Sequence, residues 1–421
     1  MQMTSREKIR RAISHQSGPV AVDFGSTAVT GIHASVVAAL RRYFGLADTP
    51  VKVHEPYQML GLVEDDLLDA MGADATGIIA RNTMFGFPNE NWREWETPWG
   101  QTVLVPENFR TRPAPGGGLH IFPEGDISAG PSGLMPAGGY FFDAVIRQEP
   151  INEDALDPAD NCEEFTDFSD ADIAHWRREI ARAAAGPRAV VAAVGGTALG
   201  DIALVPAPFM KKPRGVRDVT EWYVSLMERR DYVRAVFEHE STVALRNLER
   251  FAALAGDAVD VVYLCGTDFG TQQSQFCSPA TFDELYAPYY KRINDWIHAR
   301  TKWKTFKHTC GAVVPLIPGL IEAGFDILNP VQCSAKDMDP RRLKNEFGRD
   351  VVFWGGGVNT QETLPFGTPA QVYDEVLERL RIFAPGGGFV FNTIHNIQAR
   401  TPVENIAAML DAIRDHNKAG G

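Results

Sequence analysis

The sequence predicts an α/β fold, a (β/α)8 TIM barrel with a β-rich segment inserted in its first half. Three observations lead to this prediction. Strand-like and helix-like segments alternate after residue 170, two more strand-like segments lie earlier, and several strands end in polar or glycine-rich residues. Strands separated by helices pair in parallel, and eight such units close a barrel. A doubly wound open sheet is the alternative, but no G-x-G-x-x-G turn follows the first strand.

The first half contains short elements and an irregular stretch. Residues 4–16 have the apolar spacing of an amphipathic helix, and residues 19–23 follow as a strand. The next expected elements are helices over 31–44 and 64–71 and a strand over 73–79. Pro, Gly and aromatic residues surround short alternating runs at 101–105 and 119–122. We interpret residues 1–421 as a single barrel domain in which about 85–145 form a β-rich insertion or lid.

The second half repeats helix and strand regularly. The expected helices cover residues 170–185, 220–255, 279–301, 314–323, 340–347, 369–383 and 402–416. The expected strands cover residues 189–194, 259–265, 304–310, 327–329, 351–354 and 389–392. In a barrel, the C-terminal ends of such strands share one rim, which is where the chemistry of this fold resides.

Composition limits the function classes. The 421 residues include 41 Lys and Arg against 54 Asp and Glu, a net charge of -13. No basic block interleaves with aromatics, so nucleic acid is not expected as a partner. No apolar run approaches the length of a membrane span, and the N-terminus does not resemble a signal peptide, so we expect a cytoplasmic protein with no membrane partner. Five cysteines, an odd number, favour free thiols. The oligomeric state is open.

The triplet His308-Thr309-Cys310, followed by Gly311, is the strongest chemical signal. Residues two apart on a strand share a face, so the imidazole and the thiol would point the same way. Imidazole and thiolate suit zinc, and a catalytic zinc site needs a third protein ligand and one open position. A buried histidine beside a buried free cysteine is the structural alternative.

Two residues are candidates for the third metal ligand. His395 follows the last expected strand, within a run of polar residues, and we favour it. Cys333 follows the strand after the His-Thr-Cys segment and is the alternative. In a barrel, either position lies near enough to the rim to share one ion with His308 and Cys310.

These residues resemble those of the uroporphyrinogen decarboxylase superfamily, especially its zinc-dependent cobamide methyltransferase branch, typified by methylcobalamin:coenzyme M methyltransferases. His308 and Cys310 match the H-x-C zinc motif of that branch, and the R-T-P-V-E-N-I run at 400–406 matches its C-terminal segment. The distal cysteine of the family falls at His395 here, a change that keeps a zinc-binding group. The R-Q-A-G-R-Y motif of true uroporphyrinogen decarboxylases has no counterpart, which argues against tetrapyrrole decarboxylation.

The resemblance implies a zinc-dependent methyltransferase that moves a methyl group between a corrinoid and a small thiol, methoxy or N-methyl substrate. Methylcobalamin, or a corrinoid carried by a partner protein, would be the co-substrate, because the chain has no D-x-H-x-x-G cobalamin motif. The direction of transfer is open, so demethylation is equally expected. The alternative is a metal-free decarboxylase of a small or tetrapyrrole carboxylate on the same barrel.

Further polar residues at strand ends complete the predicted site. Asp268 and Gln272 lie in a segment similar to the D-D-x-G-x-Q strand end of the superfamily, and we expect them to orient the substrate or the metal ligands. The residues predicted to contact substrate at the rim are Asp23, Asn329, Gln332 and Asn392. For each of these residues, capping or loop hydrogen bonding is the simpler alternative.

Overall fold

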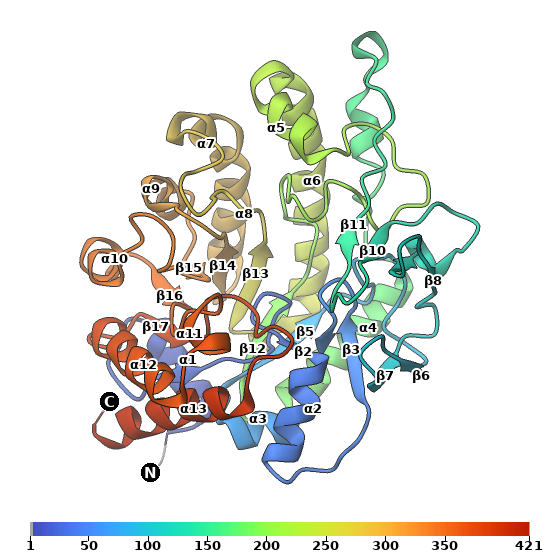
Figure 1. Ribbon diagram of the computed structural model, residues 1–421. Helices are drawn as coiled ribbons and strands as arrows, with labels where there is room; N and C mark the ends of the chain where they lie inside the picture. The colour runs from blue at the N-terminus through green and yellow to red at the C-terminus, as the bar shows by residue number, and fades with distance from the viewer. Residues whose placement is uncertain (1–2, 421) are drawn as a thin grey trace.

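Eight parallel strands form the central sheet of the computed structural model, which describes residues 3–420. The strands follow the order β1-β17-β16-β15-β14-β13-β12-β5 (Figure 1). Their bounds are β1 Ala21–Val22, β5 Ala75–Ile79, β12 Ala189–Ala193, β13 Val261–Cys265, β14 Lys304–His308, β15 Ile327–Asn329, β16 Val352–Trp354 and β17 Phe389–Phe391. The predicted barrel architecture is confirmed, and all eight strands fall on segments predicted from the sequence.

The seam between β1 and β5 joins the two ends of the sheet. The Asp74 amide donates a hydrogen bond to the Val22 carbonyl at 2.7 Å, and the Val22 amide donates to the Asp74 carboxylate at 3.0 Å. Farther along β5, the Cα of Gly77 lies against the backbone of Ser26. The two edge strands therefore meet through these contacts, which nearly close the barrel.

A short helix at the start of the chain covers the N-terminal end of the barrel. Helix α1 (Ser5–Ala12) is capped by Thr4, whose side chain and that of Glu7 form a reciprocal capping box. Its apolar side chains Ile9 and Ala12 belong to the same buried cluster as the inward-facing strand residues. The barrel interior is thus a packed core, and any opening for substrate lies at the opposite, C-terminal end.

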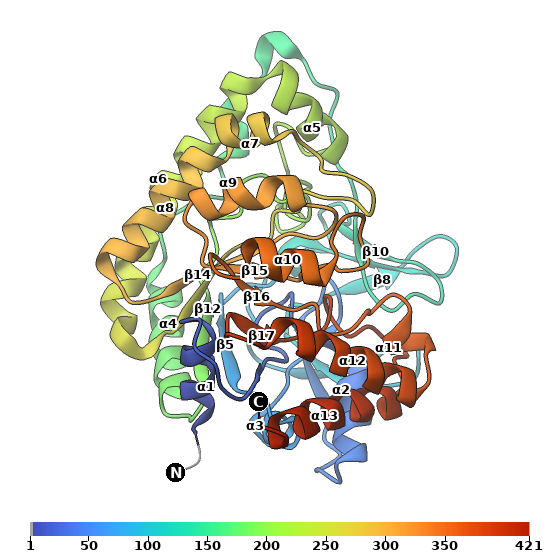
Figure 2. The ribbon, with the colours of Figure 1, turned by 90° about the vertical axis from the view of Figure 1, so that its left-hand side faces the viewer.

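Most of the remaining helices lie around the outside of the barrel (Figure 2). The remaining helices are α2 Ala34–Tyr43, α3 Asp65–Met71, α4 Asp170–Ala184, α5 Val219–Glu228, α6 Arg230–Ala255, α7 Pro279–Leu285, α8 Ala287–Arg300, α9 Ile317–Glu322, α10 Pro340–Phe347, α11 Thr363–Phe366, α12 Pro369–Phe383 and α13 Val403–Lys418. No helix within residues 3–420 has the length and apolar character needed to cross a membrane.

Two helices that the sequence predicts as continuous are each divided. The segment 220–255 breaks at Arg229, which leaves the helical conformation at φ −126° and ψ 44° and whose guanidinium binds Glu153 and Glu221. The segment 279–301 breaks at Tyr286, and the next helix begins with a proline in its first turn. Proline lacks an amide hydrogen and disfavours a helical residue before it, so it begins a helix more readily than it continues one.

Two smaller sheets contain the other strands of the first half. A mixed sheet has the order β2-β4-β3-β7-β6, and an antiparallel sheet has the order β11-β10-β9-β8. Their strands are β2 Ile32–His33, β3 Val51–Glu55, β4 Leu60–Gly61, β6 Arg93–Glu96, β7 Thr102–Val105, β8 Thr111–Pro113, β9 Leu119–Ile121, β10 Gly133–Met135 and β11 Asp143–Ala144. The first sheet begins before residue 85, because β2, β3 and β4, which were not predicted, belong to it.

Replacing Gly77 with alanine tests the packing at the seam. A Cβ atom there would lie 2.0 Å from the Ser26 carbonyl oxygen, so the backbone must shift. We expect Gly77→Ala to lower the free energy of unfolding by about 1–3 kcal/mol, as overpacking of a tight core does, measured by denaturant titration. Gly130→Ala is the matched control, because its Cβ would meet nothing within 4 Å. Equal stability of the two variants would contradict the tight seam.

Candidate metal centre

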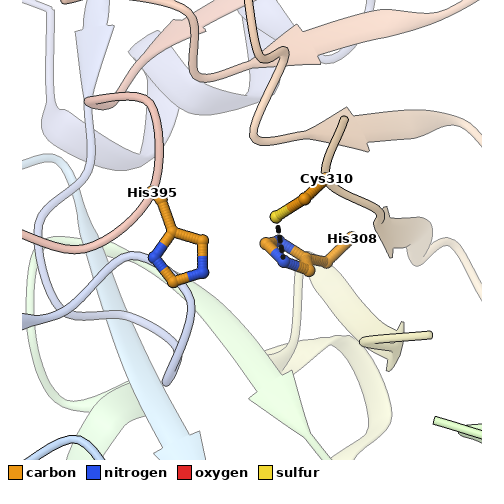
Figure 3. A group of neighbouring side chains, drawn as sticks. All are labelled: His308, Cys310 and His395. Atoms are coloured by element: carbon orange, nitrogen blue, oxygen red, sulfur yellow. Dashed lines mark hydrogen bonds between the residues drawn. The ribbon is translucent and has the colours of Figure 1, made fainter. Parts of the chain in front are cut away.

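Three metal-binding side chains converge at the C-terminal end of the barrel. Each of His308, Cys310 and His395 offers one ligand atom, and the three atoms all lie within 4.8 Å of one another. Figure 3 shows both imidazoles and the sulfur facing a common point, with His395 on a loop across from the other two. The structure therefore brings together the three favoured candidates, from segments far apart in the sequence.

The strand β14 sets the direction of His308. Phe306 belongs to the core inside the barrel, and His308, two residues later, shares its face. Its Nδ1 lies 2.5 Å from the Asn329 side-chain oxygen, and the Asn329 amide group donates in turn to the Trp354 carbonyl at 2.7 Å. The second bond fixes which end of the carboxamide is oxygen, so Nδ1 must donate. The lone pair of His308 is consequently on Nε2, which faces Cys310.

The loop that carries Cys310 is fastened on two sides. The Cys310 amide donates to the Asp268 carboxylate at 2.6 Å, and the Gly311 amide donates to the Gln332 side-chain oxygen at 2.7 Å. The Cys310 sulfur lies 3.4 Å from the Nε2 atom of His308. Asp268 itself is 3.7 Å from the same Nε2 atom. Two predicted site residues, Asp268 and Gln332, thus hold the loop through its backbone.

His395 lies on the loop after β17 in a left-handed backbone conformation, with φ at 73°. This conformation is uncommon for a non-glycine residue and persists only where its surroundings impose it. The next residue, Asn396, accepts a hydrogen bond from the Gly31 amide at 2.6 Å and donates one to the Ala28 carbonyl at 2.8 Å. The loop is therefore held by the segment that follows β1.

Burial keeps all three candidate ligands uncharged. Loss of hydration lowers the pKa of His308 to about 4, and it lowers that of His395 to about 4 with a further contribution from the charge of His308. Burial and the charge of Asp268 raise the pKa of the Cys310 thiol well above its usual value. Without a cation, the thiol donates to the His308 Nε2 lone pair. Two neutral imidazoles and a thiol that a cation can deprotonate form a donor set that fits zinc.

We call His308, Cys310 and His395 the triad, and several of the other predicted residues do not join it. Gln272 is exposed, and its amide donates to the side chain of Gln361, so it is not brought to the metal ligands. The Cys333 sulfur lies beside Gly356 and is not part of the three-residue group. Asn392 is buried, and its side chain donates to the Asp23 carbonyl at 2.7 Å, which joins the ends of β17 and β1.

Asp23 is buried beneath the rim. Its carboxylate accepts hydrogen bonds from the Ser26 hydroxyl at 2.7 Å and from the Trp354 indole nitrogen at 3.0 Å. Burial raises its pKa, and the hydrogen bonds partly oppose that shift. The structure assigns Asp23 well-defined partners within the protein, which agrees with the simpler capping role.

Sequence reasoning missed several polar groups around the site. Lys307 is fully buried, donates to the Thr267 and His308 carbonyls, and lies 4.9 Å from the centre of the Phe269 ring. Asp201, in the loop after β12, is half-buried: protein atoms surround its carboxylate, and a part of the residue remains in contact with solvent. The alternation along β14 could have indicated that Lys307 points outward. No local pattern marks Asp201, because its loop has no regular period.

A family model described as uroporphyrinogen decarboxylase (URO-D) matches residues 202–416, just over half of the chain. The chain belongs to the uroporphyrinogen decarboxylase family. The matched range includes His308, Cys310 and His395, together with most of the barrel strands. The superfamily resemblance found in the sequence is thereby confirmed, and this URO-D family member belongs to a family of enzymes.

Curated relatives match this URO-D family member locally, and solved structures match it over more of the fold. Uroporphyrinogen decarboxylases from Actinobacillus succinogenes and Azoarcus sp. are 34% and 32% identical over 76 and 81 residues. These matches cover 18% and 19% of this chain and 21% and 22% of the relatives. A methyltransferase from Methanosarcina mazei has a TM-score of 0.53 and 14% identity, with 99% of each chain covered, which shows a shared fold.

Replacing Asn329 with leucine tests its support of the metal site. Leucine keeps the approximate size but cannot accept the His308 Nδ1 hydrogen bond, so the imidazole loses its fixed tautomer and orientation. Partners of this kind change metal affinity by about 10- to 100-fold. We expect Asn329→Leu to weaken zinc binding by that factor in a competitive chelator titration, whereas Gln272→Leu should leave it unchanged. Equal affinities would show that Asn329 does not support the ligand.

The pH dependence of zinc affinity tests the protonation states of His308, Cys310 and His395. Both imidazoles are already neutral above about pH 6, since each pKa is near 4, so zinc displaces only the Cys310 proton. Affinity should therefore rise with pH by about tenfold per unit between about pH 6 and pH 8. Calorimetry in buffers of different ionisation enthalpy should show about one proton released per zinc. Release of two or more protons would mean that an imidazole is charged.

Proposed function

We propose that this protein is a zinc-dependent methyltransferase that moves a methyl group between a corrinoid and a small thiol, methoxy or N-methyl substrate. The observation that supports it most is the convergence of His308, Cys310 and His395 at the mouth of the barrel. Three protein ligands leave one position on zinc for a substrate atom, the arrangement typical of catalytic rather than structural sites. The Methanosarcina mazei protein with the same barrel is named a methyltransferase, and we carry that reaction class over as part of the proposal.

Each residue around the triad has a definite task in this proposal. Zinc, when bound, would supply a Lewis acid that lowers the pKa of a substrate thiol or polarises a methoxy or amine heteroatom. Asn329 orients the His308 ring, and Asp268 and Gln332 hold the Cys310 loop through backbone amides. Methyl transfer is an in-line displacement, so a rigid set of ligands contributes by positioning the substrate heteroatom.

A corrinoid would have to approach the C-terminal mouth, because the other end of the barrel is filled by α1. We propose methylcobalamin in solution, or a methylated corrinoid protein, as the partner. Because the three proposed zinc ligands lie at the rim, the methyl group of a substrate bound there would be accessible from outside the barrel. The substrate and the corrinoid would then react across the same opening.

Decarboxylation is the second candidate, favoured by the family name and by the two curated relatives. A polycarboxylate substrate would need cationic side chains at the rim. The side chains that hold His308 and the Cys310 loop are Asn329, Asp268 and Gln332, none of which is cationic, and the nearby Lys307 is directed outward into the helix layer. This arrangement favours methyl transfer over decarboxylation of an anionic substrate.

Methylcobalamin turnover by the zinc-loaded protein tests the proposal. We expect the visible spectrum of methylcobalamin to change on addition of an accepted thiol, or cob(I)alamin to be methylated by an accepted aryl methyl ether or N-methyl amine. Cys310→Ala should bind no stoichiometric zinc and should lower the rate by more than about 100-fold. Cys333→Ala is the matched control and should keep both zinc and activity.

Two results would contradict the proposal. Stoichiometric zinc that survives both His308→Ala and Cys310→Ala would remove the site. Decarboxylation of a carboxylate substrate by metal-free protein, without methyl transfer by the zinc-loaded protein, would support the second candidate instead.

A further inference from the structure

A small cavity lies between the loop after β12 and helices α5 and α6. Its volume is about 50 Å³, which is enough for a few water molecules. The polar side chains that line it are Asn161, Glu164, Asp201, Arg217, Trp222 and Glu240. Neither the predicted site residues nor the triad belong to this lining.

Two polar atoms at the cavity have no hydrogen-bond partner among the described residues. Glu240 is 2% exposed, and its Oε1 atom is unpaired; Trp222 is 2% exposed, and its Nε1 atom is unpaired. A buried polar group without a partner is costly, and native proteins usually satisfy such groups with ordered water. One of these atoms is a donor and the other belongs to a carboxyl group, so water is the ligand that can satisfy both.

The charged groups around Glu240 do not neutralise it. Arg217 is committed to Glu164, with hydrogen bonds of 2.7 and 3.1 Å to its two carboxylate oxygens. Burial and the charge of Glu164, with smaller contributions from Cys265 and Asp201, raise the pKa of Glu240 well above its usual value. Burial without a cationic partner of its own therefore favours the protonated form of the Glu240 carboxyl.

Asp201 borders both the cavity and the barrel mouth. Its Oδ1 accepts a hydrogen bond from the Ala203 amide at 2.9 Å, and its Oδ2 lies against Gly266 at the end of β13. A Cβ on Gly266 would be 2.8 Å from this Oδ2 and 2.5 Å from the hydroxyl of Tyr263, whose ring packs on Phe306 inside the barrel. Burial raises the pKa of Asp201 to about 6, which suits a group that gains and loses a proton near neutral pH.

We propose that the cavity holds water and that it relays a proton from Glu240 to Asp201, and from Asp201 to the substrate at the mouth. The inference rests on the proposed function in its demethylating direction. There, the bond between the methyl carbon and the substrate heteroatom breaks, and the heteroatom keeps both electrons. The methyl group bonds to the cobalt of a cob(I)alamin nucleophile, which supplies the electron pair of the new bond.

The relay supplies the proton that the heteroatom needs once the methyl group has left. The heteroatom takes its proton from Asp201, Asp201 recovers one from Glu240 through the cavity water, and solvent restores Glu240 after the product leaves. Glu240 acts only through Asp201 and does not touch the substrate.

Infrared spectroscopy of the metal-free protein tests the buried acid directly. We expect a protonated carboxyl band at neutral pH that shifts in D2O, is lost in Glu240→Gln and persists in Glu249→Gln. Glu249 is the matched control because it is an exposed glutamate on the same helix. A missing band, or a band that does not shift in D2O, would overturn the inference, because Glu240 would be ionised or its cavity dry.

Demethylation kinetics test the relay. Glu240→Gln should lower the rate by about 100-fold at neutral pH, a size typical of lost acid catalysis, and should recover as the pH falls and solvent protonates Asp201. Val236→Leu, which fills the cavity but keeps both carboxyls, should show the same defect. Zinc content should stay at the wild-type value in both variants.

The kinetic outcomes separate the two proposals. Methyl transfer in wild type with equal rates and pH profiles for Glu240→Gln and Glu249→Gln would overturn the relay alone. No methyl transfer by the zinc-loaded wild type would remove the proposed function, and the relay with it, whatever the infrared spectra show.

Discussion

The hydrogen bond between His308 and Asn329 determines what this site can do. It places a proton on Nδ1 and leaves the lone pair of Nε2 directed at Cys310. Because the Asn329 amide is itself fixed by the Trp354 carbonyl, the imidazole has one tautomer and one orientation. A histidine without this support would rotate and alternate between tautomers, and its neighbour would be only a buried thiol. The Asn329 carboxamide on the adjacent strand therefore fixes the state in which His308 can act as a ligand.

Different side chains join neighbouring strands at the two ends of the barrel. At the N-terminal end, Asp74, Asp260 and Asp326 each precede a strand, and each accepts a hydrogen bond from an amide at the start of the neighbouring strand. At the C-terminal end, Asn329 and Asn392 donate to carbonyls at the ends of neighbouring strands. Strand starts expose amides and strand ends expose carbonyls, so acceptors suit one end and donors the other. At the end where the site is assembled, side-chain amides donate to the strand ends, and the carboxylates of Asp23 and Asp268 accept from groups of the rim.

The barrel was predictable from the sequence because its strands are short apolar runs between long helices, a pattern that depends on local periodicity. The triad was predictable for a related reason: His308 and Cys310 obey the two-residue period of a strand, and His395 follows another strand of the same barrel. The breaks at Arg229 and Tyr286 were missed because helical spacing continues through both. Gln272 was assigned to the site from a motif, but the turn that follows β13 directs it to Gln361 at the surface.

The grouping of Asp201 with Glu240 was beyond sequence reasoning. The two residues come from an irregular loop and the middle of a long helix, and only tertiary packing makes them line one cavity. Strands β2 and β4 were missed because two residues are too few to show a period.

The attachment of the His395 loop to the segment after β1 has a consequence for biosynthesis. The Asn396 side chain that holds this loop binds Gly31, which lies 365 residues earlier in the chain. A nascent chain still attached to the ribosome can form β14 with His308 and Cys310, but it cannot present the third donor until its last strand has emerged and docked beside its first. The three candidate ligands therefore come together only late in folding, after the two ends of the barrel sheet have met.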